Sequence, residues 1–134
     1  MEIQPKTPST RGPAQMFTGD VWFDVIAAGQ APSRLRVNLV RFSPGARTAW
    51  HCHTNGQTLH VTDGVGLVQA RGGPVHVIHP GETIYTPPGQ WHWHGATEGD
   101  FMCHLAMWES LGEDQQGPET VWGEHVTDGE YATP

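Results

Sequence analysis

Apolar and polar residues alternate in short segments along most of the chain. Such alternation is typical of strands, because successive side chains of a strand point to opposite faces of a sheet. Glycines and prolines, 17 and 11 of them, separate the segments, and helical spacing of apolar residues is hard to find before the C-terminal region. The pattern predicts strands over residues 21–27, 35–42, 48–53, 57–63, 66–71, 75–79, 83–86, 92–96 and 101–109.

Turn residues stand between these segments. They combine glycines, which tolerate positive φ, with prolines, which fix φ near a turn value. The clearest turns are Asp63-Gly64, Gly72-Gly73-Pro74, His79-Pro80-Gly81 and Pro87-Pro88-Gly89. Many short strands joined in this way indicate an all-β protein, and a jelly-roll β-barrel fits best.

The two ends of the chain differ from the barrel segment, which we place at about residues 17–110. Residues 1–15 are polar and proline-rich, which is typical either of a disordered tail or of an arm laid across a partner subunit. The C-terminal extension, residues 111–134, begins with a loop over 112–118 and contains one capped helical turn over 126–131. We expect a single domain over residues 1–134.

Length and charge limit the classes of function. The chain has 134 residues, enough for one domain with a real core. Fourteen acidic residues against seven basic ones argue against a nucleic-acid or membrane partner, because no basic patch is available to neutralise phosphates. No apolar run near the start has the length of a signal peptide, so we expect a cytoplasmic protein. Cys52 and Cys103 lack a CxxC spacing and are expected to be reduced thiols.

Strand parity brings several polar side chains together. His51 and His53 share one face of their strand while Cys52 points away, and His92 and His94 likewise share a face. In the next strand Gln57 faces the barrel interior if its odd positions point inward. These residues form the first candidate site.

The spacing of these residues forms two motifs. The first runs from Gly45 through His51, His53 and Gln57 to Gly64, and the second runs from Gly81 through Pro87 and Gly89 to His92. In order and spacing they resemble the two signature motifs of the cupin superfamily. The chain departs from the pattern at two positions, with Gln57 where most cupins have glutamate and Ala96 where an asparagine is usual.

A narrower group is similar over most of the chain. The segments 44–51, 57–59 and 88–95, His104-Leu105-Ala106 and the ending 124–128 resemble bacterial manganese-dependent hydroxynitrile lyases and cupins associated with carboxymuconolactone decarboxylase. The resemblance implies a metal on His51, His53, Gln57 and His92. Three imidazoles and one amide oxygen are neutral, so a divalent ion keeps its full charge, and imidazole ligands suit manganese, iron, nickel, cobalt or zinc. Manganese is the ion that the resemblance favours.

The same resemblance implies the residues around the metal. His94, His104 and Thr48 would face the substrate, and Asn38, Val40 and Trp108 would shape the pocket. Parity independently predicts that His104 and Trp108 point inward. Thr48 has the opposite parity to His51 unless a bend re-aims it. The structural alternatives are a satisfied buried histidine for His104 and a rim residue for His94.

Three classes of function remain open. A hydroxynitrile lyase would cleave mandelonitrile to benzaldehyde and hydrogen cyanide, with a histidine as general base. An Fe(II)-dependent dioxygenase would use the same three histidines. A non-catalytic cupin would only bind a small molecule. For all three we expect a homo-oligomer, either a dimer or a tetramer.

Overall fold

Strands form nearly all of the regular structure in the computed structural model, which describes residues 1–131. They are β1 (Thr10–Arg11), β2 (Phe17–Thr18), β3 (Val21–Ala28), β4 (Leu35–Phe42), β5 (Arg47–Thr48), β6 (His51–His53), β7 (Gln57–Gly64), β8 (Gly66–Ala70), β9 (Val75–Ile78), β10 (Thr83–Thr86), β11 (His92–Ala96), β12 (Met102–Glu109) and β13 (Thr120–Trp122). A helical turn, α1 (Asp128–Tyr131), follows them. The prediction of an all-β protein is confirmed.

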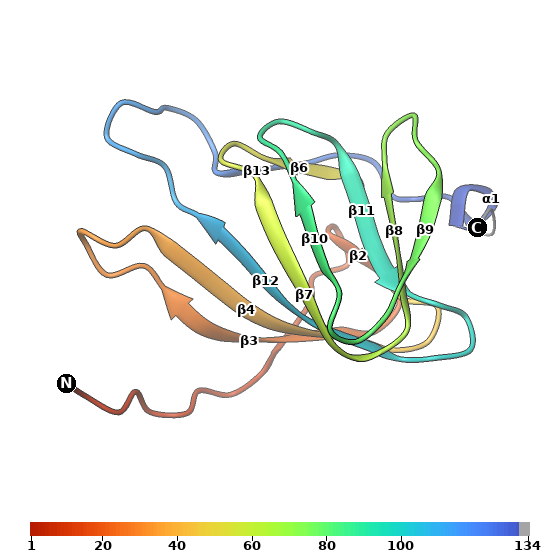
Figure 1. The fold of residues 1–134 in the computed structure, drawn as a ribbon, viewed down its shortest axis with the longest axis horizontal. Coiled ribbons are helices and arrows are strands. Elements are labelled where there is room, and N and C mark those ends of the chain that lie inside the picture. The colour runs from red at the N-terminus through yellow and green to blue at the C-terminus, as the bar shows by residue number, and fades with distance from the viewer. Residues whose placement is uncertain (132–134) are drawn as a thin grey trace.

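Two antiparallel sheets curl against each other and enclose the core (Figure 1). The six-stranded sheet has the order β1-β3-β4-β12-β7-β10. In the seven-stranded sheet β13, β6, β11, β5 and β2 follow one another, and the β8–β9 hairpin pairs with the other side of β11. This is the curled arrangement of a jelly-roll barrel, as the sequence predicts.

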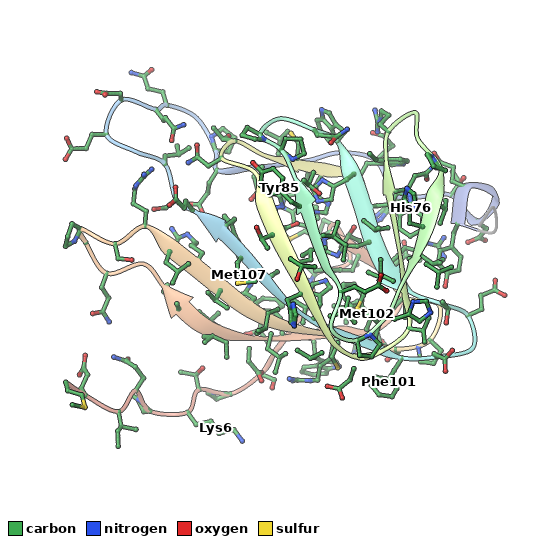
Figure 2. The ribbon with its side chains drawn as sticks, viewed as in Figure 1. Lys6, His76, Tyr85, Phe101, Met102 and Met107 are labelled. Carbon is green, nitrogen blue, oxygen red and sulfur yellow. The ribbon has the colours of Figure 1, made fainter. Side chains whose placement is uncertain are left out.

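The alternation of residues explains which side chains form the core. On β7, Leu59 and Val61 are fully buried between the sheets, while Thr58 and His60 on the other face are half-buried. On β12, Met102 is fully buried and Met107 lies on the outer face (Figure 2). The inward parity predicted for these two strands is therefore confirmed.

One expected strand is interrupted. Residues 48–53 form two short strands, because the chain bends at Ala49 and Trp50. Both pieces still pair with β11, β5 through Arg47 and β6 through His51. The bend lets Thr48 and His51 face the same side despite their odd separation. The other predicted strands are present, with ends within one residue of those expected.

The segment after β12 covers the outside of the seven-stranded sheet. Trp50 and Trp93, which parity places outward, are buried in a second apolar cluster with Val126 and Tyr131. The helical turn carries the predicted cap, since Thr127 Oγ1 accepts from Glu130 N and Thr127 N donates to the Glu130 carboxylate. This chain's own C-terminal segment therefore covers the tryptophans.

The N-terminal arm leaves the body of the molecule along the edge of β3 (Figure 1). Its first nine residues form no strand and are exposed, and β1 pairs with β3 through Thr10 and Arg11. Cys52 and Cys103 are free thiols, as expected. Within residues 1–131, no helix is long and apolar enough to cross a membrane.

Candidate metal centre

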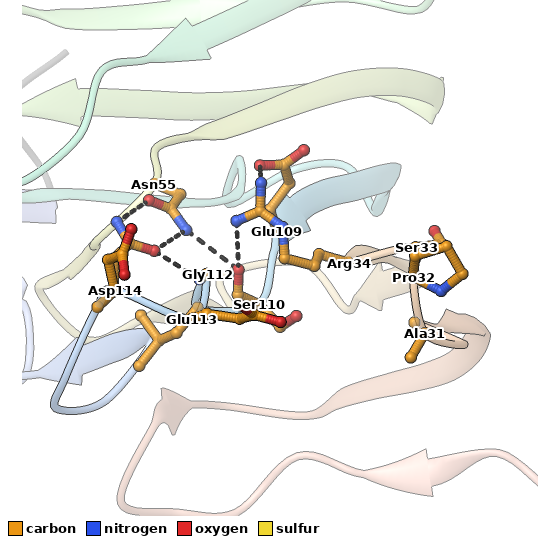
Figure 3. Close-up of a pocket in the computed structure, with 13 residues that line it drawn as sticks. Ala31, Pro32, Ser33, Arg34, Asn55, Glu109, Ser110, Gly112, Glu113 and Asp114 are labelled. Atoms are coloured by element: carbon orange, nitrogen blue, oxygen red, sulfur yellow. Dashed lines mark hydrogen bonds and ion pairs between the residues drawn. The ribbon is translucent and has the colours of Figure 1, made fainter.

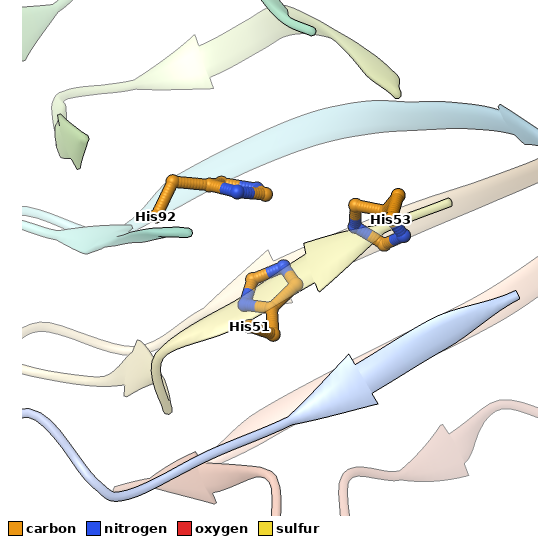
Figure 4. A group of neighbouring side chains, drawn as sticks. All are labelled: His51, His53 and His92. Atoms are coloured by element: carbon orange, nitrogen blue, oxygen red, sulfur yellow. The ribbon is translucent and has the colours of Figure 1, made fainter. Parts of the chain in front are cut away.

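Three histidines from two paired strands converge inside the barrel. His51 and His53 come from β6 and His92 comes from β11, where it is the direct cross-strand partner of His51. One ring nitrogen from each lies within 4.8 Å of those of the other two (Figure 4). All three side chains are buried. This geometry suits a single ion held by three imidazoles.

The second ring nitrogen of each histidine is already engaged. His51 Nδ1 lies 2.9 Å from the Ala49 carbonyl oxygen, His92 Nδ1 lies 3.1 Å from that of Gln90, and His53 Nδ1 lies 3.0 Å from Thr120 Oγ1. A carbonyl oxygen only accepts, so His51 carries its proton on Nδ1 and keeps a lone pair on Nε2. Such partners orient metal-ligating histidines.

Two further observations fit a metal at this point. His53 Nε2 is buried and has no hydrogen-bond partner in residues 1–131, which is costly unless something absent from the chain binds it. The side-chain oxygen of Gln57, also buried, lies 3.1 Å from His92 Nε2 and so joins the three histidines. The residues present therefore fit a divalent ion with three nitrogen ligands and one amide oxygen.

Electrostatics keep these imidazoles neutral. Burial lowers the pKa of His51 well below its ordinary value, and the neighbouring His92 and His53 lower it further. Burial and His92 lower the pKa of His53 to about 3, and burial also lowers the pKa of His92. A neutral imidazole is the form that binds a metal.

A pocket of about 200 Å³ opens beside the histidines. Most of its wall is apolar or aromatic. It is lined by Met16, Phe17, Phe23, Asn38, Val40, Thr48, His51, His53, Gln57, His94, Ala106, Trp108, Thr120 and Trp122. Thr48, His94, Asn38, Val40 and Trp108 thus lie together around this pocket, while His92 and His104 are not in its lining.

His104 lies behind His94. Its Nε2 is 3.0 Å from His94 Nδ1, and Phe42 packs against both rings. Burial lowers the pKa of His94 well below its ordinary value, and that of His104 to about 4. The hydroxyl of Thr48 accepts a hydrogen bond from the backbone N–H of His94, at 3.2 Å. His94 Nε2 makes no hydrogen bond within the described residues.

Strand β13 contributes residues that the sequence analysis missed. Thr120 holds His53, and the ring of Trp122 stacks on His51 with centroids 4.6 Å apart and planes 24° apart. The strand has only three residues, so its alternation is too short to detect. Phe17 and Phe23 were also missed, although the parity of the strand 21–27 places Phe23 on the same face as the buried Val21.

A larger cleft of about 810 Å³ lies between the β3–β4 turn and the loop after β12 (Figure 3). Several of its polar groups are bound to each other. Arg34 pairs with Glu109, and Asn55 exchanges hydrogen bonds with Gln115. The cleft therefore has no group comparable to the histidine cluster. The remaining histidines, His60, His76, His79 and His125, lie outside the histidine-lined pocket described above.

Comparison with known proteins agrees with this geometry. The family model described as a cupin domain matches residues 38–108. The chain belongs to the cupin family. A curated relative, an (R)-mandelonitrile lyase from Granulicella tundricola, is 47% identical over 123 residues, covering 92% of this chain and 91% of that protein.

Solved cupin structures have the same fold. A cupin-like protein from Thermotoga maritima superposes with a TM-score of 0.84 and is 34% identical, covering 98% of this cupin and 95% of that chain. A polyketide cyclase from Streptomyces resistomycificus superposes with a TM-score of 0.66 at 19% identity, covering 85% and 89% of the two chains. The second similarity concerns the fold alone.

Proposed function

We propose that this cupin is a metal-dependent lyase that cleaves and forms aromatic cyanohydrins, converting mandelonitrile to benzaldehyde and hydrogen cyanide. One structural observation carries the proposal. A buried, neutral histidine with a free nitrogen, His94, lies beside the metal-binding histidines in a small apolar pocket. The relative named (R)-mandelonitrile lyase, 47% identical over nearly the whole chain, supports the same reaction.

The pocket suits a small aromatic substrate. Its volume of about 200 Å³ is below the range of about 300–1,000 Å³ typical of pockets for drug-sized ligands, which leaves space for about one aromatic ring. Phe17, Phe23, Trp108 and Trp122 supply aromatic walls. No lysine, arginine or carboxylate lines it. An uncharged substrate with a polar group at the metal end therefore fits best.

We propose manganese as the ion on His51, His53, Gln57 and His92, with iron, nickel, cobalt and zinc as its competitors on the same ligands. A divalent ion held there supplies a Lewis acid that lowers the pKa of the substrate hydroxyl. No carboxylate belongs to the ligand set, so the protein leaves the charge of the ion uncompensated. The ligands themselves take up no proton near neutral pH, because burial lowers the pKa of each histidine.

Proton transfer is assigned to His94, with His104 behind it. The bond to His104 occupies His94 Nδ1, so Nε2 is the nitrogen free to take the hydroxyl proton. An electron pair of the alkoxide oxygen then forms the carbonyl double bond. The bond to the cyano carbon breaks, and the electron pair of that broken bond leaves with cyanide. The proton passes from His94 to cyanide, giving hydrogen cyanide. Thr48, whose oxygen accepts from His94 N, keeps its own O–H to donate to the substrate.

The test is benzaldehyde release from racemic mandelonitrile at mildly acidic pH, where the spontaneous reaction is slow. Manganese-loaded, iron-loaded and chelator-treated protein are compared. Metal-dependent, enantioselective release is the expected result. Release no faster than in the chelated control would overturn the proposal for this substrate, and oxygen uptake with Fe(II) would then test the dioxygenase.

We also propose that the protein works as a homo-oligomer, a dimer or a tetramer. Large apolar side chains stay exposed on the six-stranded sheet of a single copy, including Tyr85 at 65% and Leu35 at 47% (Figure 2). Such exposure favours contact with a second copy. Light scattering decides the point, since a monomer at micromolar concentration would contradict it.

A further inference from the structure

Trp108 forms part of the pocket wall beside His53. It lies one residue before the end of β12, points inward, and its ring centroid is 6.0 Å from that of His53. The side chain is half-buried and packs against the main core. The pairing of β12 with β7 ends at Met107, so at Trp108 only β4 still pairs with the strand, and a further interaction helps to hold the ring over the pocket.

That interaction is a hydrogen bond to Glu119. Trp108 Nε1 donates to Glu119 Oε1 at 2.9 Å. A half-buried indole N–H requires such a partner, since leaving it unpaired away from water costs free energy. Glu119 comes from the segment that leads into β13, and it does not line the pocket itself. It therefore contacts the pocket wall without contacting the space inside.

Arg36 fixes the carboxylate from the other side. Its Nε lies 2.6 Å from Glu119 Oε1 and its Nη2 lies 3.0 Å from Oε2, while Nη1 donates to the Ala28 carbonyl oxygen. Arg36 is also the direct cross-strand partner of Trp108 between β4 and β12. Arg36 lowers the pKa of Glu119, so the carboxylate is charged at neutral pH. A two-pronged pair of this kind fixes direction as well as distance.

We propose that Glu119 is a positioning residue that holds Trp108 as a wall of the pocket and thereby sets the size of the ligand that the pocket accepts. The effect on substrate size rests on the proposed function, whereas the effect on Trp108 does not. Loss of the carboxylate frees the indole to turn away from the pocket. The metal ligands keep their supports, because Thr120 still holds His53 and the backbone of residue 119 still pairs with Thr54.

The first measurement follows Trp108 directly. Protein labelled with 5-fluorotryptophan has six fluorine resonances, one for each tryptophan, and Trp108→Phe assigns the one of interest. In Glu119→Ala we expect this resonance to shift and to respond more strongly to replacing H2O by D2O. Glu119→Gln keeps an oxygen that can accept from the indole but loses one acceptor for Arg36, so its shift should be smaller than that of Glu119→Ala. An unchanged Trp108 resonance in Glu119→Ala would overturn the proposal.

Glu109→Ala is the matched control. Glu109 is the neighbour of Trp108 in sequence and pairs with another arginine, Arg34, at 3.4 Å, whereas the indole N–H donates to Glu119. It should leave the Trp108 resonance in place. Metal content measured on each variant shows that the site is intact. A shift of equal size in Glu109→Ala would mean that any lost ion pair at this end of the barrel disturbs Trp108, and it would overturn the specific role of Glu119.

The second measurement is substrate selection. The ratio of kcat/KM for mandelonitrile to that for the smaller acetone cyanohydrin should change about tenfold in Glu119→Ala, the scale on which a pocket contact discriminates. In the Trp108→Phe background the same substitution should change the ratio by less than about twofold, since its target is gone. An equal change in both backgrounds would overturn the proposal. If no cyanohydrin is turned over, the proposed function fails while the fluorine measurement still decides the role of Glu119.

Discussion

His104 Nε2 lies 3.0 Å from His94 Nδ1, and both side chains are buried, His104 fully. Of the two, His94 lines the pocket and His104 stands behind it, against the core. The pair thus resembles a base and the group that orients it. The resemblance drawn from the sequence named both residues as facing the substrate, and the structure separates their positions.

Substitution of the two histidines should have unequal effects. His94→Ala removes the assigned base and should lower kcat for mandelonitrile cleavage by about 10²- to 10⁴-fold, the range for a general base. His104→Ala leaves His94 in place but unoriented, so we expect a smaller loss. Steady-state kinetics on metal-loaded protein measures both. The exposed His76→Ala is the control, and a larger loss in His104→Ala than in His94→Ala would reverse the assignment.

Thr120 should affect metal binding without touching the metal. Its hydroxyl holds His53 Nδ1 at 3.0 Å, and loss of such a partner typically weakens metal affinity by 10- to 100-fold. We expect Thr120→Val to fall in this range and His53→Ala to abolish tight binding, as measured by calorimetry with Mn²⁺. Thr83→Val is a matched control, because Thr83 holds the ring of His60 at 2.9 Å outside the pocket. Unchanged affinity in Thr120→Val would contradict the role of β13.

The metal-free protein should lose stability as the pH falls from about 6.5. The folded pKa of His53 is about 3 and that of His104 about 4, both below the ordinary value of 6.5. The unfolded chain therefore takes up protons first, and stability is full above pH 6.5 and declines towards pH 4. His104 alone contributes on the order of 3 kcal/mol to this loss.

Urea unfolding midpoints in the presence of a chelator, measured between pH 7 and 4.5, test this expectation. Bound Mn²⁺ should raise the midpoint by a similar amount across the upper part of this range, because it binds the folded state only and the histidines of that state are already unprotonated there. A midpoint in chelator that stays constant over this range would show that the buried histidines are not neutral in the folded protein.

The sequence predicts the parts of this fold in which apolar and polar residues alternate over a long strand. On β7 and β12 the alternation is eight residues long, and it places Leu59, Val61 and Met102 in the core correctly. The spacing of His51, His53, Gln57 and His92 anticipates a cluster that the pairing of β6 with β11 then brings together. The first prediction depends on a local pattern, whereas the grouping of His92 with the other three residues comes from the resemblance to the two cupin motifs.

Contacts between distant segments could not be predicted in the same way. The pairing of β13 with β6 brings Thr120 to His53, which lies 67 residues away in the sequence. The residue before β13, Glu119, bonds to Trp108 at the same end of the barrel. A strand of three residues is too short to show an alternation from which this pairing could be predicted. Thr48 is a related case. Strict alternation from His51 would point its side chain away from the pocket, but the chain bends at Ala49 and Trp50, and Thr48 lines the pocket.

Substitution of Gly95 should destabilise the fold even though its backbone conformation is ordinary. It lies on β11 opposite Arg47, and a Cβ at this position would stand 2.5 Å from the Ala46 carbonyl oxygen and 2.7 Å from Arg47 Cα. These are backbone atoms of the paired strand, so they cannot move aside as a flexible side chain does. We expect Gly95→Ala to lower the free energy of unfolding by about 1–3 kcal/mol, the cost of overpacking a tight core. Urea denaturation measures the change.

Gly99→Ala is the control, because nothing lies within 4 Å of its added carbon, and it should be neutral or slightly stabilising. Equal stability of the two variants would show that β5 and β11 can separate without cost, and that the hydrogen bond from His94 N to Thr48 does not depend on their close approach.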